Sequence, residues 1–176
     1  MLRWFRNREL KNLAAKNATH KLYGGFNEVK KIGLFIDGLC GQESAAALFN
    51  EHFTKKEQKA LTVFAYMPLK KKVIDLDYPY LHLAKNQKNW LGIPKGEDLD
   101  QFVNQDYDVV LDFTHLNLIA HQFVRAQLQC KLLVAVGETP LAGADIQIRV
   151  NPARDTASAL SQSLKYLKLI NSTKNG

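Results

Sequence analysis

The stretch KIGLFID at residues 31–37 decides the fold class. It is a continuous apolar run between a lysine and an aspartate, without alternation of apolar and polar residues. Such a strand is buried on both faces, as in the parallel sheets of α/β proteins. Similar runs occupy residues 61–66, 107–113 and 131–136, and a weaker alternating run occupies 146–150. The sequence therefore predicts a sheet with buried central strands.

Helical segments separate these strands along the chain. They are predicted over residues 43–59, 99–103, 117–128 and 155–170, and a short strand is predicted near residues 80–83. Alternation of strand and helix is typical of a mainly parallel sheet with helices on both faces. We therefore expect a three-layer α/β fold that resembles a Rossmann half-domain.

Two helix starts can be predicted in more detail. Asp155 is expected to cap the last helix, and Thr114 is expected to cap the helix over residues 117–128. In that helix, spacing predicts four inward-facing apolar residues: Leu118, Ile119, Phe123 and Ala126.

A basic helix is predicted before the first strand, over residues 2–19, and Gly24 and Gly25 end it. The chain accordingly divides into a helical extension at residues 1–25 and one α/β domain at residues 26–176. Residues 1–31 carry eight basic and two acidic side chains, a net charge of +6, whereas the other 145 residues carry a net charge of +1.

The charge of this extension indicates a polyanion-binding function. The candidate residues are Arg3, Arg6, Arg8, Lys11, Lys16 and Lys21. Cations near phosphates release counterions, so RNA, a ribonucleoprotein or an acidic protein is the expected partner. The alternative is that these cations only keep a surface helix soluble. A non-catalytic binding or accessory protein is the leading functional hypothesis.

Polar residues that directly follow the apolar strands form a second candidate site. In open parallel sheets, ligands bind beyond the carboxyl ends of the strands. The residues at these positions are Asp37, Gly38, Cys40, Asp112, Thr114, His115, Gly137 and Glu138. They suggest a site for an anionic or nucleotide-like small molecule, or an enzyme that uses Asp37, Asp112, His115 and Glu138.

Structural roles compete with this second hypothesis. Asp37 and Gly38 together are typical of a tight turn. Cys40 near a helix start, with His115 as its partner, would be a nucleophile, but cysteine is also a common buried residue. The sequence contains no G-x-G-x-x-G or P-loop motif, no metal-ligand spacing and no indication of a particular cofactor. Whether the protein is an enzyme stays open.

Aromatic residues near lysines form a third pattern. Tyr78, Tyr80 and Trp90 flank lysines 70–72, Lys85 and Lys88. Interleaved aromatic and basic residues are used for single-stranded nucleic acid, whereas Tyr and Trp in a proline-containing segment also cover the margin of a core.

Composition limits the class of protein. The chain has 176 residues, of which 46% are hydrophobic and 23% charged, which is typical of one folded domain. Its two cysteines cannot form a disulfide framework, and no apolar run is long enough to span a membrane. We therefore expect a cytoplasmic protein.

Several short segments resemble a family of short uncharacterised proteins from Bacteroidetes, a domain of unknown function. The similarity is carried by residues 31–37, 89–92, 98–102 and 107–112, and by Gly137 at a strand end. The resemblance implies a bacterial cytoplasmic α/β protein and transfers no activity.

Overall fold

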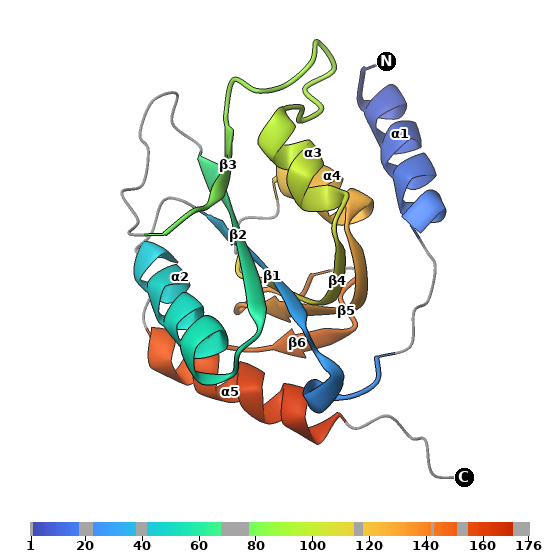
Figure 1. Ribbon diagram of the computed structural model, residues 1–176. Helices are drawn as coiled ribbons and strands as arrows, with labels where there is room; N and C mark the ends of the chain where they lie inside the picture. The colour runs from blue at the N-terminus through green and yellow to red at the C-terminus, as the bar shows by residue number, and fades with distance from the viewer. Residues whose placement is uncertain are drawn as a thin grey trace, which may run out of the picture.

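A parallel sheet forms the centre of the structure (Figure 1). The computed structural model describes residues 2–17, 23–37, 42–67, 78–114, 118–141, 143–150 and 155–170. Within these residues the sheet has six strands: β1 (Lys31–Asp37), β2 (Ala60–Met67), β3 (Leu81–Ala84), β4 (Asp106–Asp112), β5 (Gln129–Val136) and β6 (Ile146–Ile148).

The strand order is β3-β2-β1-β4-β5-β6, and all neighbouring strands are parallel. This is the order of doubly wound dinucleotide-binding folds, in which the direction of winding reverses between β1 and β4. The register places Phe35 opposite Asp112 and Asp37 opposite Tyr66. The predicted α/β class with a mainly parallel sheet is confirmed.

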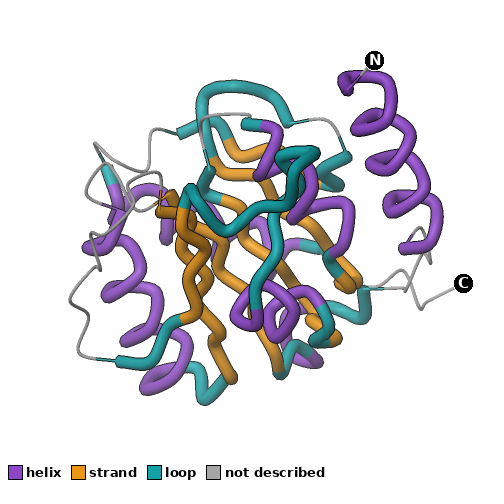
Figure 2. The backbone as a smooth tube through the Cα atoms, turned by 90° about the horizontal axis from the view of Figure 1, so that it is seen from above, coloured by secondary structure: helices purple, strands orange, loops and turns teal. Residues whose placement is uncertain are grey.

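Helices cover both faces of the sheet, as the tube drawing in Figure 2 also shows. On one face lie α2 (Gln42–Asn50), its π-helical continuation η2 (Glu51–Lys56) and α5 (Thr156–Leu169). On the other lie α3 (Glu97–Val103) and α4 (Ile119–Gln127). A short 3₁₀ turn, η1 (Phe26–Glu28), precedes β1, and α1 (Leu2–Asn17) packs outside α4.

The side chains of β1 explain this layering. Ile32, Leu34 and Ile36 pack in the cluster under α2 and α5, whereas Phe35 packs in the cluster under α3 and α4. Both faces of the strand are therefore buried, as its unbroken apolar run predicts. At Gly33 a Cβ atom would lie 3.2 Å from the Tyr107 ring and from Val110, so this position favours glycine.

Some local predictions are confirmed and others are wrong. Asp155 caps α5, since its carboxylate accepts a 2.9 Å hydrogen bond from the Ser158 N–H. Thr114 does not cap α4, which begins five residues later with Leu118 at its N-cap. Leu118 and Ile119 are exposed and not inward-facing, because the first turn of α4 borders a pocket.

Two boundaries also differ from the sequence prediction. The segment 43–59 is not one α-helix, because it changes to π-helix at Glu51 and then leads into β2. The predicted strand near residues 80–83 is observed as Leu81–Ala84. Among the described residues, no helix combines the length and apolar character that crossing a membrane requires.

Candidate functional site

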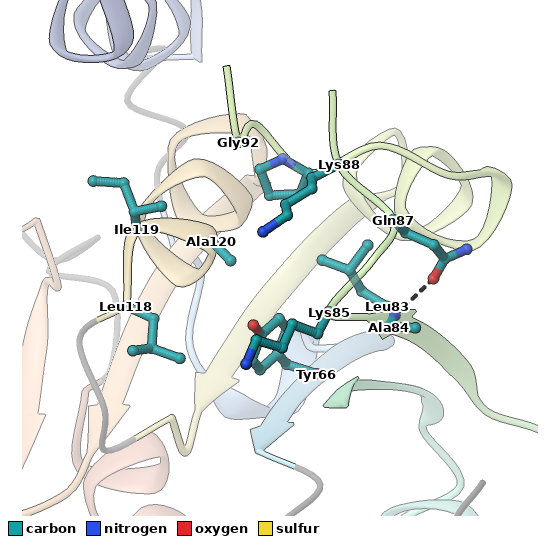
Figure 3. A pocket seen from close by; sticks show the side chains of 11 residues that line it. Tyr66, Leu83, Ala84, Lys85, Gln87, Lys88, Gly92, Leu118, Ile119 and Ala120 are labelled. Carbon is teal, nitrogen blue, oxygen red and sulfur yellow. Dashed lines mark hydrogen bonds between the residues drawn. The ribbon is translucent and has the colours of Figure 1, made fainter. Parts of the chain in front are cut away.

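A pocket of about 310 Å³ opens at the carboxyl ends of β2 and β3 (Figure 3). We call it the edge pocket. Its floor comes from the sheet: Tyr66, Leu83 and Ala84. One wall comes from the loop after β3: Lys85, Gln87, Lys88, Gly92 and Pro94. The opposite wall is the start of α4: Leu118, Ile119 and Ala120. Ligand sites in proteins commonly have volumes from about 300 to 1,000 Å³, so the edge pocket accommodates a small metabolite.

Two lysines make the edge pocket cationic. Figure 3 shows the ammonium groups of Lys85 and Lys88 directed into the space between the loop and α4. Gln87 points away from this space, and its side-chain oxygen accepts a 2.6 Å hydrogen bond from the Ala84 N–H. No aspartate or glutamate lies among the described residues that line the pocket. An anionic group is therefore the complementary ligand chemistry.

The first turn of α4 adds to this preference. Its N-cap residue, Leu118, has an apolar side chain that accepts no hydrogen bond from the helix. The backbone N–H groups of a first turn have no partner within the helix, and the helix dipole places partial positive charge there. This positive end borders the same space as Lys85 and Lys88.

Tyr66 connects the edge pocket to a buried polar group on the neighbouring strand. Burial and the nearby charge of Asp37 raise the pKa of the Tyr66 phenol. Like an ordinary tyrosine, Tyr66 is protonated at neutral pH, and its hydroxyl is a hydrogen-bond donor toward the pocket. Behind it, the buried His121 ring stands edge-on to Tyr66, with the ring centres 4.8 Å apart.

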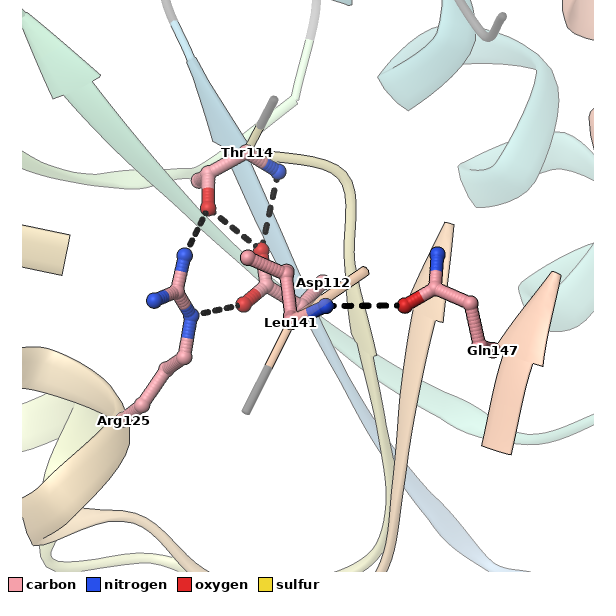
Figure 4. A network of polar contacts seen from close by, with 5 residues as sticks. All are labelled: Asp112, Thr114, Arg125, Leu141 and Gln147. Atoms are coloured by element: carbon pink, nitrogen blue, oxygen red, sulfur yellow. Dashed lines mark hydrogen bonds and ion pairs between the residues drawn. The ribbon is translucent and has the colours of Figure 1, made fainter. Parts of the chain in front are cut away.

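A closed polar network occupies the end of β4 (Figure 4). Asp112 is fully buried and accepts hydrogen bonds of 2.8 and 2.6 Å from the Thr114 N–H and hydroxyl. The other carboxylate oxygen of Asp112 pairs with the Arg125 Nε, and the Arg125 Nη2 donates a 2.8 Å hydrogen bond to the Thr114 hydroxyl. These three residues join β4 to α4, and their polar groups are already engaged with one another.

The structure brings together only some of the residues that the sequence places in the crevice. Asp37, Asp112 and Thr114 lie at the ends of the adjacent strands β1 and β4. None of the three lines the edge pocket. Gly38, Cys40 and His115 fall outside the described residues.

Gly137 and Glu138 follow β5 and also lie apart from the edge pocket. Gly137 has a structural role, because its N–H donates to Ile148 at 2.9 Å and its carbonyl accepts from the Gln147 amide at 2.9 Å. Gln147 also accepts a hydrogen bond from the Leu141 N–H at 3.1 Å, which holds the loop after β5 (Figure 4). Glu138 is exposed on this loop.

The cations of the N-terminal extension lie on α1, away from the sheet. Arg3, Arg8 and Lys11 are exposed, whereas Arg6 is half-buried on the side that faces the body. Lys16 belongs to the last turn of α1, and Lys21 falls outside the described residues.

Sequence reasoning did not indicate Tyr66 as a site residue, and it placed Lys85 and Lys88 only in the aromatic and basic pattern typical of nucleic-acid binding. Tyr66 lies inside the predicted strand over residues 61–66 and not after it, so its position did not mark it as a candidate. The best sequence signal was the stretch 85–96, which has three lysines and no acidic residue. Among the described residues, no three His, Cys, Asp or Glu side chains are grouped as a metal site requires.

Comparison with known protein families gives a match over most of the chain. A family model covers residues 1–170, and its description is a family of unknown function, DUF6913. No curated protein and no solved structure matches the chain.

Proposed function

The chain belongs to the family of unknown function DUF6913, and from its geometry we propose that it binds a small anionic molecule in the edge pocket. The observation that carries this proposal is the convergence of Lys85, Lys88 and the α4 N-terminus on one concave space. A phosphate or carboxylate at this point would meet two ammonium groups and the positive end of the α4 helix dipole.

The rest of the ligand is expected to be apolar or aromatic. Leu83, Pro94 and Leu118 provide apolar surface, and Tyr66 provides a ring and a hydroxyl donor. A nucleoside monophosphate or an aryl phosphate combines the two properties. The proposal is one of binding, because Asp112 and Thr114 at the neighbouring strand end are hydrogen-bonded within their own network.

The test uses adenosine 5′-monophosphate, phenyl phosphate and inorganic phosphate as probes, measured by thermal shift and calorimetry. At least one organic phosphate is expected to raise the melting temperature, since a ligand that binds the folded state stabilises it. Lys85→Ala and Lys88→Ala are each expected to weaken its binding about tenfold or more, as loss of a charge-assisted hydrogen bond does.

The matched control is Lys165→Ala, because Lys165 is an exposed lysine of α5 on the opposite face of the sheet. This variant is expected to bind the probe like the unmodified chain. Equal affinity in all three lysine variants, or no stabilisation by any probe, would refute the proposal.

A second candidate function is polyanion binding by α1. The observation that favours it is the orientation of the helix: Arg6, Leu10 and Leu13 are half-buried toward the body, whereas Arg3, Arg8 and Lys11 are exposed to solvent. RNA is the polyanion we propose, and a ribonucleoprotein or an acidic protein is the alternative partner. A bacterial source and a cytoplasmic location stay predictions.

Salt dependence tests this second function. Binding of a labelled 20-nucleotide RNA is measured by fluorescence anisotropy between 50 and 300 mM salt. The triple variant Arg3→Ala, Arg8→Ala, Lys11→Ala is expected to reduce the slope of log affinity against log salt by about 2, since each phosphate contact contributes about 0.7 for single strands. A control variant removes three exposed lysines from the other face: Lys55, Lys56 and Lys165. Binding without salt dependence would contradict α1 as the RNA contact.

A further inference from the structure

Trp90 is the most exposed of the large hydrophobic side chains that the structure describes, at 81%. It lies in a turn held by hydrogen bonds on both sides of it. The Asn89 side-chain oxygen accepts from the N–H groups of Leu91 and Ile93 at 2.9 and 3.0 Å. The Gly92 N–H donates to the Asn89 carbonyl at 2.9 Å, and Gly92 has a φ of +77°. The turn therefore presents a tryptophan to solvent on a fixed backbone.

This exposure separates the two interpretations of the aromatic residues near the lysines. Tyr78 and Tyr80 are half-buried and pack against the core, as the covering role requires. Trp90, by contrast, is mostly exposed and does not have this covering role. Two exposed lysines of the same loop, Lys88 and Lys95, flank Trp90 in the sequence. No acidic residue occurs between residues 85 and 96, so the loop is cationic.

The turn borders α1. The nearest side-chain atom to a Cβ built on Gly92 is the Nη1 of Arg6, at 3.9 Å. Figure 1 shows the loop between β3 and α3 at the same end of the molecule as the N-terminal half of α1. On the outward side of α1, Trp4 is 59% and Phe5 44% exposed, and the Arg8 guanidinium lies 5.5 Å from the Trp4 ring centre. Aromatic and cationic groups therefore occupy both neighbouring elements.

We propose that these exposed groups together contact one single strand of RNA, and we call them the aromatic–basic surface. It comprises Trp4, Phe5, Arg3, Arg8, Trp90 and Lys95. Unpaired bases stack on the exposed rings, and the cations contact the phosphates between them. A duplex does not fit this chemistry, because its base faces are already stacked. The proposal rests on polyanion binding by α1 and adds the strand class and the stacking residue.

The experiment compares three labelled probes at 100 mM salt: a 20-nucleotide oligouridine, the corresponding oligothymidine and a 20-base-pair RNA duplex. The protein is expected to bind both single strands more tightly than the duplex. Trp90→Ala is expected to weaken oligouridine binding about tenfold and to leave duplex binding unchanged, since base stacking on an aromatic residue is sequence-tolerant and needs an open base face. Trp90→Phe is expected to restore most of the loss.

The matched control is Tyr166→Ala, which removes an exposed aromatic ring from α5 on the other face. Equal binding of single strand and duplex, with no effect of Trp90→Ala, would overturn this inference and leave polyanion binding by α1 in place. Failure to bind any of the three probes would overturn both. Preferential binding of polyglutamate would instead assign the surface to an acidic protein and reject RNA. Preference for oligothymidine over oligouridine would assign the surface to single-stranded DNA and likewise reject RNA.

Discussion

Two cationic regions lie at the carboxyl edge of the same sheet, and they use their charges in opposite ways. At the end of β4, Arg125 has a side chain that is only 9% exposed and is paired with the fully buried Asp112. At the ends of β2 and β3, Lys85 and Lys88 are exposed and face an open pocket.

The contrast distinguishes structural from ligand-binding polar groups. A buried charge has to be paired and hydrogen-bonded, because its desolvation is otherwise too costly. Asp112 and Arg125 satisfy this requirement internally, so they fasten α4 to the sheet. Lys85 and Lys88 converge on a cavity whose described lining residues include no carboxylate, so their donors are available for a ligand. Asp112 was a candidate site residue because of its position at the end of a strand, yet position alone does not separate these two roles.

The largest effect is expected from breaking the closed network. Arg125→Ala leaves the Asp112 carboxylate buried without its cation, so the free energy of unfolding is expected to fall by about 3–5 kcal/mol, measured by urea denaturation. Arg149→Ala removes an exposed arginine and is expected to change stability by less than about 0.5 kcal/mol. If Arg125→Ala and Arg149→Ala lower the free energy of unfolding by the same amount, the network does not fasten α4.

An intermediate effect is expected from a charge placed at the open site. Leu118→Asp and Leu118→Asn both introduce a side chain that caps α4, and each is expected to stabilise the fold by about 1 kcal/mol. The aspartate also places a negative charge at the pocket wall. Leu118→Asp is therefore expected to bind a phosphate probe about tenfold more weakly than Leu118→Asn. Equal affinities in the two variants, measured by calorimetry, would exclude an anion site beside this helix end.

The smallest effect is expected at the opposite edge of the sheet. Burial tends to raise the pKa of Asp108, but hydrogen bonds from Lys131 at 2.7 Å and from the backbone N–H groups of Lys30 and Lys31 lower it overall. A carboxyl group with a lowered pKa stabilises the fold above the pKa of the unfolded chain, about 3.9, and loses this contribution as the pH falls through its folded pKa.

Urea denaturation between pH 6 and pH 2.5 measures this contribution. Asp108→Asn keeps an acceptor for the backbone N–H groups but removes the charge, so its stability is expected to fall less with decreasing pH. Lys131 is partly exposed, and the loss at neutral pH is therefore expected to be about 1 kcal/mol or less. Glu51→Gln, at an exposed position, serves as the control. Parallel pH profiles of the Asp108 variant and the unmodified chain would contradict the role of this carboxylate.

Much of the fold was predictable from periodicity. The buried strands β1, β4 and β5 are the unbroken apolar runs, and Asp155 caps α5 as its position before a helical segment predicts. Thr114 was predicted wrongly because its hydroxyl is engaged by Asp112, two residues away, and by Arg125, 11 residues away. The contact with Arg125 is not encoded in any local pattern.

The candidate site was less predictable. Leu118 and Ile119 have the spacing of core residues, yet both are exposed and border the edge pocket. The reason is that the edge pocket separates the start of α4 from β3 and the following loop. Lys85 and Lys88 follow the short strand β3, whose four residues are a weak signal. The pairing of β3 with β2 brings this loop opposite α4.

Apolar runs and their spacing were thus sufficient to predict which segments are strands and that helices cover both faces of the sheet. The positions of the charged residues were sufficient to show that the N-terminal segment is basic. These properties depend on each residue and its near neighbours. Which loop meets which helix, and therefore which cations share a pocket, depends on the order in which the strands pair. That order minimises the free energy of the whole chain, and contacts between residues far apart in sequence decide it.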